Sequence, residues 1–214
     1  MNRNVTSPAG LRGVVLATVV TVGASASAAG TAVNLTDVSV AIEQRVCRAQ
    51  ALATDPSPTA VDELLTGLDS RSEPLREAVI ASLKAKKGDV VLIERALDKK
   101  RPAASRVASL AGLRVLKPAD VAPKLVPLLD DVDESVRESV AHTFVVLGPA
   151  AAEAKLVLSL KTEKSAKVRY FVVVALGALK TPAAKSAVAT RAKTETDFAV
   201  KDAIDQALVK QAQP

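Results

Sequence analysis

Cysteine, histidine and aromatic residues are scarce in this chain of 214 residues, which has one cysteine, one histidine, three phenylalanines, one tyrosine and no tryptophan. The single cysteine, Cys47, cannot form an internal disulfide, so the fold must be stable through packing alone. Hydrophobic residues, chiefly Ala, Val and Leu, still make up 49% of the sequence. Such small side chains suit closely spaced helices better than a core built around large rings. We expect Cys47 itself to be a small buried hydrophobe, with an intermolecular disulfide or a reactive thiol as the alternative.

Patterns that carry catalysis or bind cofactors are missing as well. His142 has no cysteine or acidic partner at metal-ligand spacing, and the chain has no glycine-rich phosphate loop. No base is arranged to activate the scattered serines. The sequence therefore predicts a protein that is not an enzyme and has no metal or cofactor, and His142 is expected on the surface or in a partner contact.

Residues 1–28 have the pattern of a secretory signal peptide. Arg3 and Arg12 precede a short apolar run, "GVVLATVVTVG", and the small residues of "ASASA" follow it. Cleavage fits best after Ala26 or Ala28. The apolar run is short for a bilayer span, although an uncleaved anchor or a chance Ala/Val tail are the alternatives. We therefore expect a protein exported to the periplasm or the cell exterior, with no stable membrane span after cleavage.

The formal net charge is +6, and the predicted cleavage would remove two of the arginines that contribute to it. This mild excess, without stacking aromatics, gives little support for nucleic-acid binding. Lysines and arginines do gather in several segments that are expected to be turns, where ordinary solvated charge is the default interpretation. These residues are Lys84, Lys86, Lys87, Lys99, Lys100, Arg101, Lys161, Lys164 and Lys167.

A phrase built around one basic residue recurs every 30 to 32 residues. Large or β-branched apolar residues mostly stand one before, three after and seven after this basic residue, and these offsets share one face of a helix. Each such helix follows another apolar stretch, so the unit is a helix A, a turn and a helix B. One hairpin cannot bury its apolar face alone, whereas stacked neighbours can. The basic anchors are Arg76, Arg106, Arg137, Arg169 and Lys201.

The phrases "DVDESVRESVAHTFVVLG" (131–148) and "EKSAKVRYFVVVALGAL" (163–179) resemble HEAT repeats, in the short form found in proteins of the phycobilisome-lyase type. The resemblance extends over about residues 58–212. It implies an all-α fold, a right-handed α-solenoid of about five helical hairpins. The second copy departs most from the pattern, because Ser105 replaces a valine and Lys100 stands where an acid is expected.

The predicted organisation has three parts: a signal peptide (1–28), a mature N-terminus with a capping helix (29–57), and the repeat array (58–214). Within residues 36–54 we expect one amphipathic capping helix with Val38, Ile42 and Val46 facing inward. The array divides into hairpins at 58–87, 88–117, 118–147, 148–180 and 181–212.

Three acids stand six residues before an anchor: Asp131, Glu163 and Glu195. Because acid and base both follow the period of the fold, we interpret them with the anchors as a structural ladder. Each arginine is expected to bond turn carbonyls and the acid of its own or the next unit. A row of ligand-binding cations is the alternative, but a specific ligand site rarely needs five equal copies.

The outward face of the B helices gives the sharpest functional indication. His142, Val145, Tyr170 and Val174 occupy outward offsets in the middle units, and we expect them to form a small apolar and aromatic strip that binds a protein partner. The alternative is that Val and Ala simply extend onto the surface of an Ala/Val-rich chain.

The expected function is thus an exported scaffold or adaptor that binds a protein partner and performs no chemistry. Two other functions stay open. The repeat resemblance implies a chromophore-lyase-like activity, and the basic turns allow an envelope protein that binds acidic surface polymers. The partner's identity and the oligomeric state do not follow from the sequence.

Overall fold

The computed structural model describes residues 33–68 and 70–213, and in these residues all regular secondary structure is helical. The predicted signal peptide lies outside them. No helix in the described part of the chain is both long and apolar enough to cross a bilayer. The helices are α1 (Ile42–Ala51), α2 (Ala60–Gly67), α3 (Glu73–Ala85), α4 (Gly88–Leu97), α5 (Ala103–Leu116), α6 (Ala122–Leu125), η1 (Val126–Asp130), α7 (Glu134–Leu147), η2 (Ala150–Ala152), α8 (Glu153–Thr162), α9 (Ala166–Gly177), α10 (Pro182–Ala192) and α11 (Phe198–Ala212).

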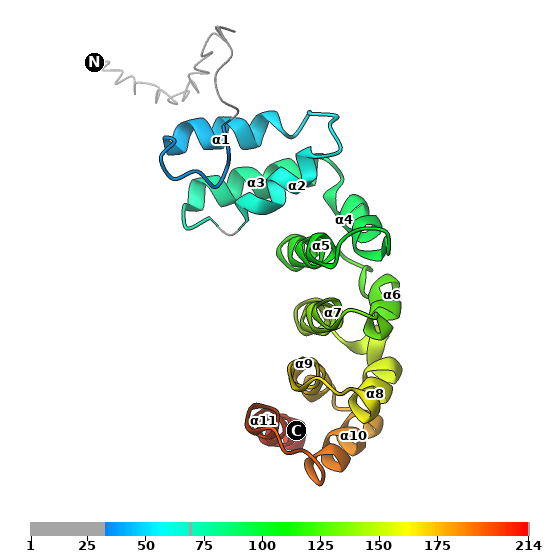
Figure 1. Ribbon diagram of the computed structural model, residues 1–214. Coiled ribbons are helices and arrows are strands. Elements are labelled where there is room, and N and C mark those ends of the chain that lie inside the picture. The colour runs from blue at the N-terminus through cyan, green and yellow to red at the C-terminus, as the bar shows by residue number, and fades with distance from the viewer. Residues whose placement is uncertain (1–32, 69, 214) are drawn as a thin grey trace, which may run out of the picture. The chain divides into compact units, whose positions relative to one another are not determined.

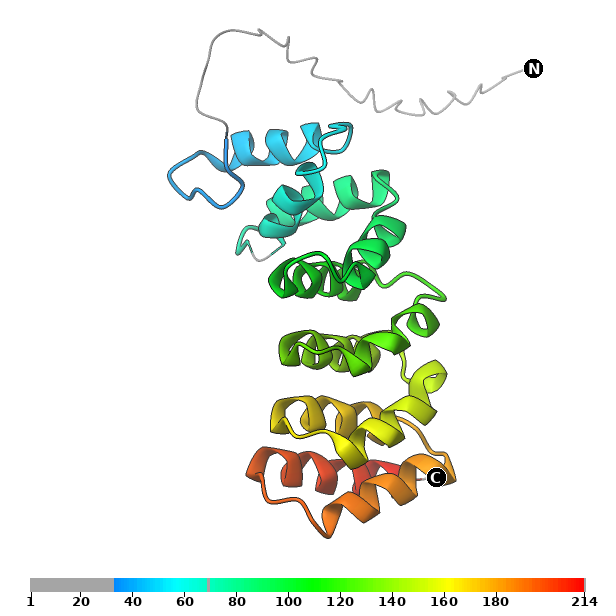
Figure 2. The ribbon, with the colours of Figure 1, turned by 45° about the vertical axis from the view of Figure 1, so that its right-hand side comes forward.

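From α4 onward the helices form two layers of a stack. The B helices α5, α7, α9 and α11 lie side by side in one layer, and the A helices α4, α6, α8 and α10 lie in the other (Figures 1 and 2). Each B helix packs against the next B helix and against its own A helix. This arrangement is an α-solenoid, and the prediction of the fold class is confirmed. Its right-handedness stays a prediction.

The apolar spacing of the B helices explains why they pack in this way. Val136, Val140 and Phe144 stand one before, three after and seven after Arg137, and all three are completely buried. The corresponding side chains of the next unit are also completely buried. Side-chain caps fix where the last three of these helices begin: the Asp133, Ser165 and Asp197 side chains accept from N–H groups in the first turns of α7, α9 and α11.

The N-terminal hairpin departs from the regular stacking. Helix α3 packs chiefly on α1 and only slightly on α5, whereas α5, α7, α9 and α11 each pack closely on the neighbouring B helix. Unit one therefore joins the capping helix more closely than it joins unit two, although its own helices keep the A–B order.

The capping helix is shorter than predicted, and the inward orientation of Val38 is wrong. Helix α1 begins only at Ile42, and the Val38 side chain is 86% exposed. The cause is local: Asn34 accepts from the Thr36 N–H at 2.9 Å, and Asp37 accepts from the Ser39 N–H at 2.9 Å. These side-chain-to-backbone bonds hold the segment in turns that compete with the helix.

The preferred interpretation of Cys47 as a buried residue is also wrong, because its side chain is exposed. Helix α1 buries Ala49, and residues two apart lie on different faces of a helix. Cys47 therefore lies on the solvent side of the capping helix.

Gly177 marks a close contact between α9 and α11. A Cβ added there would lie 2.7 Å from the Ala207 Cβ and 3.1 Å from its Cα. Backbone-to-backbone proximity of this kind requires small residues on both helices.

We predict that Gly177→Ala lowers the free energy of unfolding by about 1–3 kcal/mol, although alanine is the better helix former. Ala207→Gly should restore part of this loss in the double variant, because it removes the atom that the new Cβ meets. Denaturant unfolding followed by circular dichroism measures all four combinations. Strictly additive effects would contradict this account of the contact.

Candidate protein-binding face

Ion pairs connect consecutive units: the pairs made by Arg106 and Arg169 are buried, and the pair made by Arg137 is partly buried. Arg106 donates to Asp131 (Nη2–Oδ2 2.5 Å), Arg137 to Glu163 (Nε–Oε2 2.8 Å), and Arg169 to Glu195 (Nε–Oε2 2.8 Å). In each pair the second guanidinium nitrogen bonds the other carboxylate oxygen. Each arginine comes from a B helix and each acid from the A–B turn of the next unit. The bidentate geometry fixes the distance and orientation between units.

The same arginines also bind turn carbonyls. Arg106 Nε donates to Ala96 O at 2.9 Å, Arg137 Nη1 to Asp131 O at 2.8 Å, and Arg169 Nη1 to Lys164 O at 2.6 Å. Because these donors are satisfied from both sides, the guanidinium groups can be buried at a tolerable desolvation cost.

The first and the last of the five anchors make no ladder pair among the described residues. Arg76 donates to Ser70 O at 2.6 Å but has no carboxylate partner among the described residues. The acid that should face it is replaced by Lys100, which explains why the regular pairing begins only at unit two. Lys201 makes no ladder pair among the described residues, and its side chain is exposed.

Other ion pairs take over at the N-terminal hairpin. The buried Arg95 of α4 donates to Asp62 of α2, and Arg48 of α1 donates to Glu63 of α2 at 2.6 Å. Sequence reasoning missed both pairs, because neither follows the repeat period.

The pKa values of the ladder carboxylates all lie below their ordinary values. The hydrogen bonds from Arg169 hold the pKa of Glu195 well below its usual value, and the bonds from backbone N–H groups and Arg191 add to this effect despite burial. For Asp131 and Glu163, burial opposes ionisation, but the arginine and backbone hydrogen bonds outweigh it and lower both pKa values.

On the outer side of α7 and α9, three rings form a cluster. His142 stacks on Phe171 with the ring centroids 4.5 Å apart, and Tyr170 meets Phe171 edge-on at 5.2 Å. The Tyr170 side chain is 37% exposed, while the other two rings are half-buried. We call His142, Tyr170 and Phe171 the ring cluster. It contains the only histidine and two of the four Phe and Tyr residues of the sequence.

The structure brings only part of the predicted strip together on the surface. His142 and Tyr170 meet through Phe171, whereas Val145 and Val174 are partly buried and pack against the core. Sequence reasoning missed Phe171 because its offset from Arg169 was assigned to neither the inward nor the outward face. Its position next to Tyr170, in a chain with so few aromatic residues, was the signal that could have identified Phe171.

A hollow of about 400 Å³ borders the ring cluster between α7, α9 and the start of α11. Ala166 and Ala199 give it apolar walls, and Glu138, Lys167 and Asp197 place charges around it. Behind the cluster, Arg114 of α5 donates to the Ser139 and Thr143 hydroxyls, each at 3.1 Å. Burial lowers the pKa of His142 and the charge of Arg114 lowers it further, so the ring is neutral at pH 7.

The comparisons with known proteins agree with this architecture. A sequence profile described as HEAT repeats matches residues 122–209, which span the third, fourth and fifth hairpins up to α11. These units are HEAT repeats. The narrower likeness to the phycobilisome-lyase form stays a prediction, and no curated protein sequence matches the chain significantly.

Among solved structures, human deoxyhypusine hydroxylase in complex with glycerol is similar in fold. The TM-score is 0.50 at 20% sequence identity, and the match covers 83% of this chain and 71% of that one. At this identity the likeness describes the fold alone. Within residues 33–68 and 70–213, no three His, Cys, Asp or Glu side chains gather in a way that could hold a metal ion.

We predict that Glu195→Gln lowers the free energy of unfolding by about 3–5 kcal/mol, because it leaves the buried Arg169 charge without a carboxylate. The matched control is Glu63→Gln in the half-exposed pair with Arg48, with an expected loss below about 1 kcal/mol. Urea unfolding at neutral pH measures both. Equal losses would show that burial does not set the strength of these pairs.

The contribution of Glu195 to the free energy of unfolding should also depend on pH. Its folded-state pKa lies below the ordinary value of 4.5, so its stabilisation is complete above that value and is lost as the pH falls toward the folded-state pKa. The stability gap between wild type and Glu195→Gln should therefore narrow as the pH falls from about 5 to about 3. A gap that stays constant over this range contradicts the assignment.

Proposed function

We propose that this protein is a HEAT-repeat scaffold that binds a protein partner through the exposed side of α7 and α9. The observation that supports this is the ring cluster: the chain places three of its few rings together at the surface, beside a hollow with apolar walls and charges at its edge. Half-exposed rings surrounded by charge are the usual composition of a protein interface centre. Stacked helical repeats commonly use one face for such binding.

The support beneath the cluster favours binding without large rearrangement. His142 and Phe171 lie on neighbouring B helices whose spacing is set by the pair Arg137–Glu163 and by completely buried valines. Because the contact residues are already held in place, little conformational entropy is lost when a partner binds. A displayed surface of this kind needs no catalytic group.

We further propose that the protein acts after export, as the signal-like segment at residues 1–28 predicts. No feature of the ring cluster specifically supports a chromophore-lyase-like activity or the binding of acidic surface polymers. Likeness to the fold of deoxyhypusine hydroxylase says nothing about an activity of this chain.

The binding face is tested by a photo-reactive amino acid placed at Tyr170 and, as a control, at Leu158 of α8, which is 51% exposed in the other layer of helices. We expect one crosslinked protein from position 170 and not from position 158. Tyr170→Glu should reduce recovery of that protein by tagged full-length chain about tenfold or more, as the loss of an interface centre does. Equal crosslinking from both positions would contradict the proposed face.

Export is tested independently by the N-terminal sequence of the protein isolated from cell fractions. We expect the mature chain to begin at Ser27 or Ala29 in the exported fraction. A chain that keeps Met1 and stays with the cytoplasmic fraction would refute export, and this result would leave the proposed binding face unaffected.

A further inference from the structure

Two arginines at the N-terminal end differ from all the others. Among the described residues, every arginine except Arg45 and Arg71 makes a hydrogen bond or an ion pair within the protein. Arg45 and Arg71 come from different segments, yet both line the same cleft. Paired arginines are the rule in this fold, so two unpaired ones facing one space point to a missing acceptor.

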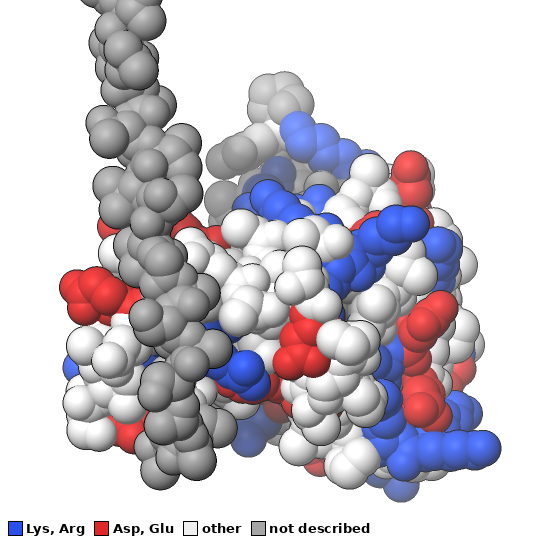
Figure 3. Space-filling view, turned by 90° about the horizontal axis from the view of Figure 1, so that it is seen from above, with Lys and Arg blue, Asp and Glu red and all other residues white. Residues whose placement is uncertain are grey.

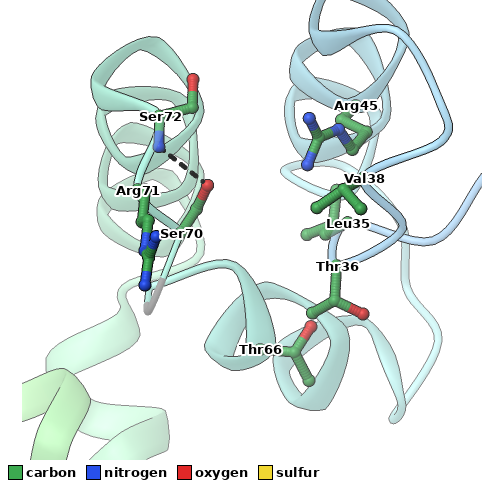
Figure 4. A pocket seen from close by; sticks show the side chains of 8 residues that line it. All are labelled: Leu35, Thr36, Val38, Arg45, Thr66, Ser70, Arg71 and Ser72. Carbon is green, nitrogen blue, oxygen red and sulfur yellow. Dashed lines mark hydrogen bonds between the residues drawn. The ribbon is translucent and has the colours of Figure 1, made fainter.

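The cleft has a volume of about 530 Å³ and lies between α1 with the segment before it, helix α2, and the segment before α3. Figure 4 shows Arg45 on the α1 wall and Arg71 on the opposite wall, together with the two serines that flank Arg71. Leu35 and Val38 form an apolar part of the lining on the Arg45 side.

The Nε atom of Arg45 is buried and has no hydrogen-bond partner. No acceptor of the protein therefore satisfies this guanidinium group, and a ligand would meet it through the two terminal nitrogens, which are not buried. The serines add further donors. Ser72 makes no side-chain capping bond with α3, and Ser70 Oγ accepts from the Ser72 N–H at 3.2 Å, which leaves its own O–H available.

The two threonines of the lining are less available, because Thr36 already donates to Asn34 and Thr66 to Glu63 O. Asp37 is the carboxylate whose charge acts on Arg45, and it is the competitor that an anionic ligand must overcome. On the end face drawn in Figure 3, basic and acidic side chains are interspersed. The charge visible on this face is therefore not a continuous basic surface.

We propose that this cleft binds a phosphate group, held by the guanidinium groups of Arg45 and Arg71 and by the hydroxyls of Ser70 and Ser72. Guanidinium groups present planar, forked donors that match phosphate oxygens. The exposed Val38 side chain gives the lining an apolar part that a short carbon chain can contact, so a phosphate monoester should bind better than free phosphate. This site is separate from the ring cluster, and its test does not depend on the proposed protein partner.

The experiment titrates the full-length chain with inorganic phosphate and with butyl phosphate at low ionic strength, by calorimetry and by amide NMR shifts. We expect saturable binding, with shifts confined to residues near Arg45 and Ser70–Ser72. Arg45→Gln and Arg71→Gln should each weaken binding about tenfold, because each removes charged hydrogen bonds. Arg101→Gln is the matched control, since Arg101 pairs only weakly with Asp98 at 3.7 Å, and it should change nothing.

A variant that is expected to strengthen phosphate binding separates an effect on the site from a loss of folding. Asp37→Asn removes the competing charge and should tighten phosphate binding, and thermal unfolding shows whether each variant is folded. Tighter binding of butyl phosphate assigns a monoester as the ligand source, and equal affinity assigns the free ion. No saturation up to about 10 mM, or affinity unchanged in both arginine variants, would overturn the site.

Discussion

The arrangement of the regular units depends on one repeated interaction, a guanidinium group that bonds the turn of its own unit and the carboxylate of the next. Arg137 shows both functions, since it donates to Asp131 O in its own turn and to Glu163 in the following one. A purely apolar contact between helices rich in alanine and valine would allow sliding along the helix axes. The bidentate pair removes this freedom, because its geometry is satisfied at only one relative position of the two units.

The fixed distance between units holds the ring cluster on α7 and α9 together. The contact between His142 and Phe171 joins two helices from different units, so it exists only where those units hold a constant register. In the N-terminal hairpin the ladder is interrupted, and there the side chains are held by pairs outside the period, such as Arg95 with Asp62. The unpaired Arg45 and Arg71 occur in this irregular part and not in the regular stack.

Periodicity made the repetitive part of the fold predictable. The spacing of Val136, Val140 and Phe144 was sufficient to assign a buried helix face, because packing between units repeats with the sequence. Local competition was not predictable in this way: the turns made by Asn34 and Asp37 shorten the capping helix and expose Val38. Of the candidate site, the sequence indicated His142 and Tyr170. It gave no indication of the cleft with Arg45, whose members come from three separate segments.

The direction of the ladder has a consequence for how such a chain can change in length. Each complete unit offers one arginine forward and receives one backward through its turn acid, as the central unit does with Arg137 and Asp131. Insertion of a whole hairpin within the regular stack therefore creates one new donor and one new acceptor in the correct order, and removal deletes both. At the junction before α4 this balance fails, since Lys100 replaces the acceptor. Growth or shortening by duplication is thus compatible with the C-terminal stack and not with the N-terminal junction.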